Sequence, residues 1–444
     1  MRNENFHVFS SASEHRTRDF LNQFQRVRGF FAQSTGTVPT EPAPVTVMIF
    51  GTATEFQPYR PNGFAAAYYT TKADHDFIVV GETTWQSSQA ATHEYTHLVF
   101  RRAGFSLPPW LNEGLADFFS TLRPYGADTE FGDIMPARLE ALNNEPWVPM
   151  EIILAADQKS PYYNEESKAG ALYNQGWALV HMLMTKDPYR SRFWEVIQAI
   201  DHGTPSVQVL EKVYGMPFSQ LETALRSYVS GDYFKKYRVK VKLDDKEDLS
   251  GQPADMFDVR EVQAELLMGR RNTLEESRAQ FAELAHEAPG RPEPWVALGY
   301  LAWDNDQPGV AEEHFAKAFE LGDRNSRLLS DYASLASDNH PEASAAAFKA
   351  LLERDPKNLN ARLTLARLQL DQKQYAEALA TAGPITQVRT AEQRDSLLYL
   401  RAYASLQLGD MATARARAQE LKNLSTSGDD QARAEEILRA ASPH

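Results

Sequence analysis

Three short segments of the chain carry the residue types that zinc-dependent hydrolysis requires. They are HEYTH at 93–97, NEGLAD at 112–117 and YNQG at 173–176. Residues four apart lie one turn apart on the same face of a helix, so His93 and His97 can direct ring nitrogens at one metal ion. The spacing therefore predicts a helix that supplies two ligands of a metal site.

A third ligand is expected on a separate element, because a catalytic zinc ion takes three protein ligands and keeps one position open. Glu113 follows His97 by 16 residues, beyond a glycine and a proline pair that must end the first helix. Glu94, next to the first histidine, would then act as general base, because a carboxylate can take a proton from water that zinc activates.

The second segment predicts another helix, beginning near Asn112, which we expect to cap it, and continuing to about Leu122. Asp117 falls one turn after Glu113, where its carboxylate could accept the free ring N–H of a ligand histidine. The alternative for Asp117 is a surface carboxylate near a helix start, a position that the helix dipole favours.

An HExxH motif followed by WLNEGLAD at 110–117 resembles the gluzincin metallopeptidases, which include thermolysin-like and aminopeptidase-like enzymes. With a Y-x-x-G motif further on, the pattern is most similar to bacterial aminopeptidase-like relatives. The resemblance implies an α+β catalytic domain with a small sheet and a helical subdomain, and one Zn²⁺ ion. It also implies zinc ligands His93, His97 and Glu113, general base Glu94, Asp117 as the partner of a ligand histidine, and Tyr173 as hydrogen-bond donor to the developing oxyanion.

Each motif also has a plainer explanation. An HExxH pentapeptide can arise by chance on an amphipathic helix, although Glu113 within its own helical motif is a second, independent pattern. Tyr173 lies in an aromatic, alanine-rich segment at 169–184 and could be a core residue. His181 lies two turns further on, and we expect it to be a core histidine rather than a ligand.

The segment Gly63, Phe64, Ala65, Ala66 is expected to begin the substrate edge strand of the sheet, with Phe64 to Tyr69 able to hold a peptide by strand addition. In the aminopeptidases that the chain resembles, this strand carries a glutamate for the free amino terminus. No carboxylate occurs at 63–68. Aminopeptidase activity is therefore in doubt, and an endopeptidase is the alternative.

Hydrophobic periodicity predicts alternating strands and helices at 1–82 and mainly helices at 83–240. Together these residues form the expected metallopeptidase domain, in which Trp194 and Phe218 are assigned to the core. The predicted strands lie at 6–10, 44–50, 63–70 and 76–80. The predicted helices lie at 12–33, 86–102, 112–122, 168–184 and 193–200, and 207–229 is expected to form two helices with a turn at 214–217 between them.

A charged segment at 241–258 is expected to be a linker, and residues 259–444 then repeat. Bulky or small apolar residues recur there every 33 to 36 residues, in a pattern that resembles tetratricopeptide repeats and predicts an all-α solenoid of stacked helix pairs. Such repeats would bind a peptide or protein partner; alternatively, they would only pack on the catalytic domain. The recurring residues are Phe281, Phe315, Phe348, Ala382 and Ala418.

Composition limits the partners and the ligands. The net charge is −14, from 46 Lys and Arg against 60 Asp and Glu, so nucleic acid is a poor partner. We find no apolar run of transmembrane length and expect no membrane insertion. The absence of cysteine excludes thiolate ligands and disulfides. In the resembling families a signal segment precedes such a start, so we expect an exported protein, periplasmic or extracellular; a cytoplasmic location is the alternative.

Two functions follow from these patterns. The first is a zinc metallopeptidase acting on a peptide or protein substrate, with repeats that bind the substrate or a partner protein. The second is a non-catalytic assembly or scaffold protein, in which the repeats do the binding and the metal site is structural or vestigial. A base beside two ligand histidines favours the first, because a purely structural site needs no base.

Overall fold

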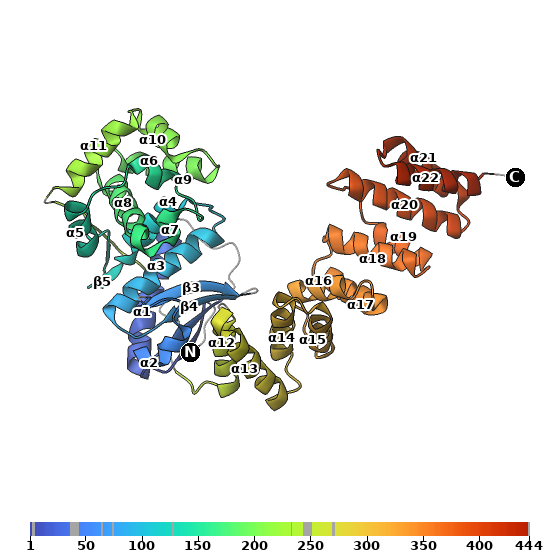
Figure 1. The fold of residues 1–444 in the computed structure, drawn as a ribbon, viewed down its shortest axis with the longest axis horizontal. Coiled ribbons are helices and arrows are strands. Elements are labelled where there is room, and N and C mark those ends of the chain that lie inside the picture. The colour runs from blue at the N-terminus through green and yellow to red at the C-terminus, as the bar shows by residue number, and fades with distance from the viewer. Residues whose placement is uncertain are drawn as a thin grey trace. The chain divides into compact units, whose positions relative to one another are not determined.

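The computed structural model describes residues 1, 5–35, 44–63, 65–72, 75–126, 128–231, 233–242, 251–268 and 271–442. It divides the chain into two compact units, an N-terminal unit of Met1–Asp255 and a C-terminal unit of Met256–His444 (Figure 1). The chain is mostly helical, and only the N-terminal unit carries strands within the described residues. Each unit has its own buried core.

The N-terminal unit contains a four-stranded sheet in the order β1-β2-β4-β3. Three strands run parallel, whereas β3 runs antiparallel to β4 and forms one edge. The central strands β2 and β4 are rich in valine and isoleucine, which suit strands buried on both faces. The strands are β1 (Phe6–Ser10), β2 (Val45–Ile49), β3 (Ala67–Lys72) and β4 (His75–Val80).

The edge strand begins later than its sequence pattern predicts. Gly63, Ala65 and Ala66 precede β3 instead of forming its first residues, and Phe64 lies outside the described residues. The alanine-rich start has weak strand propensity, and pairing with β4 defines the strand only from Ala67 onward.

Two long helices pack with this sheet. The helix α3 (Trp85–Arg102) packs against β3 and β4, and α1 (Glu14–Phe30) packs against α3. Aromatic rings join these elements: the Phe24 ring centroid lies 5.3 Å from that of Phe6 in β1 and 4.9 Å from that of Tyr95 in α3. The core therefore fixes α3 between the sheet and the remaining helices.

The rest of the N-terminal unit is helical apart from a small second sheet. Its strands are β5 (Arg123–Tyr125), β6 (Asp128–Phe131) and β7 (Tyr237–Val239), all antiparallel. The helices are α2 (Ala53–Phe56), α4 (Pro109–Ser120), α5 (Pro136–Asn144), α6 (Met150–Ala155), α7 (Pro161–Asn164), α8 (Glu166–Thr185), α9 (Phe193–Asp201), α10 (Ser206–Tyr214) and α11 (Phe218–Val229).

Two local expectations are wrong. Asn112 does not cap its helix, because α4 already begins at Pro109, whose fixed φ suits the first helical turn. Trp194 is 43% exposed. The buried stripe of α9 follows Phe193, Val196, Ile197 and Ile200, so Trp194 falls outside it.

The C-terminal unit consists of successive helix pairs. The five recurring apolar residues of the sequence all lie buried on the second helix of a pair. The helices are α12 (Met256–Leu267), α13 (Leu274–Glu287), α14 (Glu293–Asp304), α15 (Pro308–Glu320), α16 (Ser326–Leu335), α17 (Pro341–Arg354), α18 (Leu359–Asp371), α19 (Tyr375–Ala382), α20 (Ala391–Gln407), α21 (Met411–Leu424) and α22 (Gly428–Ala440).

Close packing inside a pair is clearest between α14 and α15. A Cβ atom added at Gly299 would lie 2.3 Å from Cε1 of Phe315, so only glycine fits beneath this ring. The small and aromatic residues of the sequence pattern are therefore in direct contact across α14 and α15. In the described part of the chain, no helix is long and apolar enough to cross a membrane.

Candidate metal centre

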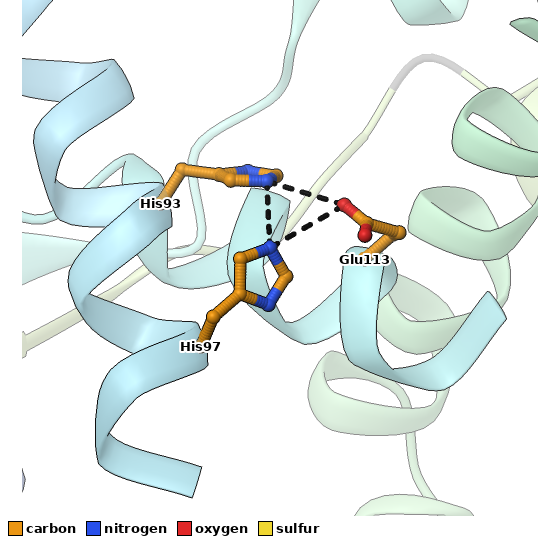
Figure 2. Close-up of side chains that lie close together, drawn as sticks. All are labelled: His93, His97 and Glu113. Atoms are coloured by element: carbon orange, nitrogen blue, oxygen red, sulfur yellow. Dashed lines mark hydrogen bonds and ion pairs between the residues drawn. The ribbon is translucent and has the colours of Figure 1, made fainter. Parts of the chain in front are cut away.

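The three predicted ligands lie together in the N-terminal unit. His93 and His97 project from one face of α3, and Glu113 projects toward them from α4 (Figure 2). Thr84 caps the start of α3, because its Oγ1 accepts the Ser87 N–H at 3.1 Å. The start of the helix determines the face on which both histidines lie.

Two glycines allow α4 to lie close to α8. A Cβ on Gly114 would be 2.7 Å from the Gly176 carbonyl oxygen, and a Cβ on Gly176 would be 2.7 Å from the Trp110 carbonyl oxygen. Neither glycine could carry a side chain without moving backbone. The glycines of the NEGLAD and YNQG segments thus hold the Glu113 helix and the Tyr173 helix against each other.

The three candidate ligand atoms have the separations that a four-coordinate ion requires. His93 Nε2 lies 3.1 Å from His97 Nε2 and 3.2 Å from Glu113 Oε2, and the third separation, His97 Nε2 to Glu113 Oε2, is 3.5 Å. Ligands about 2.0–2.1 Å from a tetrahedral zinc ion would be about 3.3 Å apart. The three side chains also form the one candidate metal cluster within the described residues.

The hydrogen bonding of His93 favours a bound cation at this cluster. Its Nδ1–H donates to Asp117 Oδ1 at 3.0 Å, which leaves Nε2 with a lone pair facing the Glu113 carboxylate. Although burial alone lowers the pKa of His93, the two carboxylates outweigh it and hold that pKa well above its usual value. A proton or a metal ion therefore stabilises this arrangement, and the donor set of two imidazoles and one carboxylate suits zinc.

Asp117 is fixed in turn by Arg138 of α5. The Arg138 Nη2 atom lies 2.6 Å from Asp117 Oδ2, and Asp117 is only 2% exposed. The predicted histidine partner is thus a buried ion-paired residue in the structure. His97 differs from His93, because its Nδ1 is buried without a hydrogen-bond partner among the described residues.

Glu94 lies beside the cluster and contacts the sheet edge. Its Oε2 accepts the Tyr69 backbone N–H of β3 at 3.1 Å. Burial raises the pKa of Glu94 above its usual value, against the opposing effect of the two histidines. A carboxylate with a raised pKa is suited to act as a general base and then as a general acid.

The free edge of β3 presents backbone groups near Glu94. The Gly81 N–H donates to the Ala66 carbonyl at 2.9 Å, so the alternation of an antiparallel ladder directs the backbone groups of Ala67, Tyr69 and Thr71 away from β4. The Tyr69 N–H is taken by Glu94, and no acidic side chain occurs on this strand.

Tyr173 of α8 lies close to the predicted ligands. Burial raises the pKa of Tyr173, and the charge of Glu113 adds to that effect. The Arg138 guanidinium lies 5.4 Å from the Tyr173 ring centroid, and the Tyr173 hydroxyl has no hydrogen bond to the described residues. Its hydroxyl therefore remains a protonated donor.

Two side chains of this site were not predicted from the sequence. The Tyr163 hydroxyl of α7 donates to Glu113 Oε1 at 3.1 Å, and Arg138 binds Asp117. Neither belongs to a motif, and only the fold brings them here. His181 lies apart from the cluster as expected: it is fully buried, with Nε2 3.0 Å from the Gly132 carbonyl and Nδ1 2.7 Å from the Tyr228 hydroxyl.

Comparison with known proteins identifies the repeats. A family model described as a tetratricopeptide repeat matches residues 334–391, so the repeats predicted from the sequence are confirmed there. No curated protein matches the chain. None of these findings points to a gluzincin or another peptidase family, and the resemblance of the N-terminal unit to one rests on its motifs.

Several solved structures are similar to this chain at low identity. The type IV pilus biogenesis factor PilW has 16% identity and a TM-score of 0.26, covering 42% of this chain and 87% of its own. A tetratricopeptide repeat protein from Parabacteroides merdae has 16% identity and a TM-score of 0.24, with 66% and 98% covered. Yeast Tom70 has 12% identity and a TM-score of 0.20, with 80% and 81% covered.

Proposed function

We propose that the N-terminal unit is a zinc-dependent peptidase and that the repeats bind its substrate or a partner protein. The observation that carries the proposal is the convergence of His93, His97 and Glu113 at tetrahedral separations, with the Glu94 carboxylate beside them. Zinc held by these three residues would supply Lewis-acid polarisation of the scissile carbonyl and activation of water.

The chain's own residues would divide the remaining work. The Glu94 carboxylate would accept a proton from the attacking water and return it to the leaving amine, because its raised pKa makes it a stronger base than an ordinary carboxylate. The Tyr173 hydroxyl, which makes no hydrogen bond to the described residues, would donate to the oxygen on which negative charge develops.

The substrate would lie along β3 as an added strand. The outward N–H and C=O groups of Ala67 and Thr71 would form hydrogen bonds with the peptide backbone. The Tyr69 carbonyl would also bind the peptide, whereas the Tyr69 N–H would keep its hydrogen bond to Glu94. Because β3 carries no carboxylate to bind a free amino terminus, we propose cleavage within peptides rather than removal of the first residue.

The test combines metal analysis with a proteome-derived peptide library. We expect one zinc ion per chain and cleavage that Glu94→Gln lowers by about 10²–10⁴-fold, with zinc retained because Glu94 is not a ligand. Glu140→Gln is the matched control, since Glu140 is an exposed carboxylate on α5. Products that begin inside the peptides would support endopeptidase action, and single released amino acids would contradict it.

A scaffold function is the second candidate, favoured by the tetratricopeptide match. Such repeats commonly mediate protein–protein interaction by presenting an extended concave surface. Under this proposal the full-length protein would form a stable complex with a partner and cleave nothing in the library. Glu94→Gln would then leave every measured property unchanged, in contrast to the peptidase proposal.

A further inference from the structure

The two carboxylate oxygens of Glu113 have different surroundings. Oε2 faces the histidines, 3.2 Å from His93 Nε2 and 3.5 Å from His97 Nε2. Oε1 points the other way and accepts the Tyr163 hydroxyl at 3.1 Å. One oxygen is therefore directed at the cluster, and the other is held by a side chain.

Tyr163 is placed by its own short helix rather than by the metal helices. The helix α7 begins at Pro161 and is capped by Ser160, whose Oγ accepts the Tyr162 N–H at 3.3 Å. The helix α7 packs against α8. The Tyr163 ring packs against the core cluster of the N-terminal unit. A phenol is protonated at neutral pH, so the hydroxyl is a constant donor to Glu113.

Tyr163 and Tyr173 are therefore not equivalent, although both lie near Glu113. The Tyr163 hydroxyl is already committed to Glu113 Oε1, whereas the Tyr173 hydroxyl has no hydrogen bond to the described residues. A hydroxyl that is occupied by a ligand carboxylate is suited to orienting that ligand. A hydroxyl without a partner is suited to a substrate.

We propose that Tyr163 is a positioning residue that holds Glu113 with a single oxygen toward the two imidazoles and thereby raises the affinity of the site for zinc. The inference rests on the zinc site of the proposed function. Without the hydrogen bond, the carboxylate could rotate and offer both oxygens or neither, and loss of such a partner typically lowers metal affinity by about 10–100-fold.

The test measures zinc affinity of the full chain by competition with a chromogenic chelator. We expect Tyr163→Phe to bind zinc about 10–100-fold more weakly than the wild type. Tyr162→Phe, which removes the hydroxyl of a neighbouring half-buried tyrosine, should stay within about twofold. The visible spectrum of the cobalt-substituted protein should change in Tyr163→Phe alone, because it reports the ligand geometry.

The outcomes separate this inference from the proposed function. Equal zinc affinity and an equal cobalt spectrum in Tyr163→Phe and the wild type would overturn the positioning role. Should the phenylalanine variant fail to fold, Tyr163→Leu removes the same donor and is judged by the same comparison. A wild type that binds zinc but cleaves no peptide contradicts only the peptidase; a wild type that binds no zinc contradicts both.

Discussion

Two histidines of the N-terminal unit, the partly buried His93 and the fully buried His181, show how neighbouring groups shift the pKa of an imidazole. His93 faces the carboxylates of Asp117 and Glu113, which overcome the effect of burial and hold its pKa well above the usual value. His181 faces a carbonyl and a hydroxyl, and burial lowers its pKa to about 4. The first site therefore attracts a cation, whereas the second keeps a neutral ring.

The neutral state of His181 predicts a pH-dependent stability. In the unfolded chain an imidazole takes up a proton near pH 6.5, whereas the folded chain resists protonation until about pH 4. Below pH 6.5 the unfolded state therefore binds more protons than the folded state. The free energy of unfolding should be highest above pH 6.5 and should decrease by up to about 3 kcal/mol as the pH falls toward 4.

Urea unfolding at pH 7 and at pH 5 checks this expectation. His181→Gln should flatten the pH dependence relative to the wild type, because glutamine does not titrate. His202→Gln, at an exposed histidine, should leave the dependence as it is in the wild type. An unchanged slope in His181→Gln would show that other groups cause it.

At the scale of elements, the site depends on how closely α4 approaches α8. The contact runs through Gly114 and Gly176, with no room for a Cβ atom at either position. Glu113 precedes Gly114, and Tyr173 lies one turn before Gly176. The distance between α4, which carries the predicted ligand Glu113, and α8, which carries Tyr173, is therefore set by these two glycines.

Replacing Gly176 by alanine should move these helices apart. The new Cβ would lie 2.7 Å from the Trp110 carbonyl oxygen, which belongs to the backbone and cannot rotate away. We expect a loss of about 1–3 kcal/mol in the free energy of unfolding and weaker zinc binding.

The same substitution on the same helix provides the control. Gly170 has no atom within 4 Å of an added Cβ, so Gly170→Ala should stabilise α8 by about 0.5–1 kcal/mol through helix propensity. Thermal unfolding and chelator competition measure both variants. A Gly176→Ala variant as stable as the wild type would contradict the close-contact explanation.

At the scale of the whole molecule, the chain consists of two units with separate cores. The N-terminal core joins the sheet and its helices in one cluster, whereas the C-terminal unit has successive smaller clusters along its helix pairs. Stability of a repeat array is roughly a sum of repeat and neighbour terms. The two units should therefore respond separately to core substitutions.

Phe315→Ala tests this independence. Phe315 is fully buried in the C-terminal unit, so we expect a loss of about 3–5 kcal/mol there. Zinc affinity of the N-terminal unit should not change. Calorimetry should show one transition moved to lower temperature and another left in place; a common shift of both transitions, or a fall in zinc affinity, would show that the units are coupled.

The sequence by itself determined the residue types and the order of the candidate metal cluster, and it determined the repeat. His93, His97 and the recurring residues such as Phe315 follow helical periodicity, which is local and therefore visible in one chain. The same reasoning misplaced the cap of α4 and the start of β3, because boundaries depend on neighbouring elements.

Only the tertiary structure decided what surrounds the predicted ligands. Tyr163 forms a hydrogen bond with Glu113, which lies 50 residues away in the sequence, and Tyr69 forms one with Glu94, 25 residues away. No rule of sequence spacing predicts either contact. Arg138 reaches Asp117 in the same way. Periodicity tells which face of a helix is buried, but the partner on the other side depends on how the elements pack. Asp117 was therefore predicted from its spacing, whereas Tyr163 and Arg138 were found only in the fold.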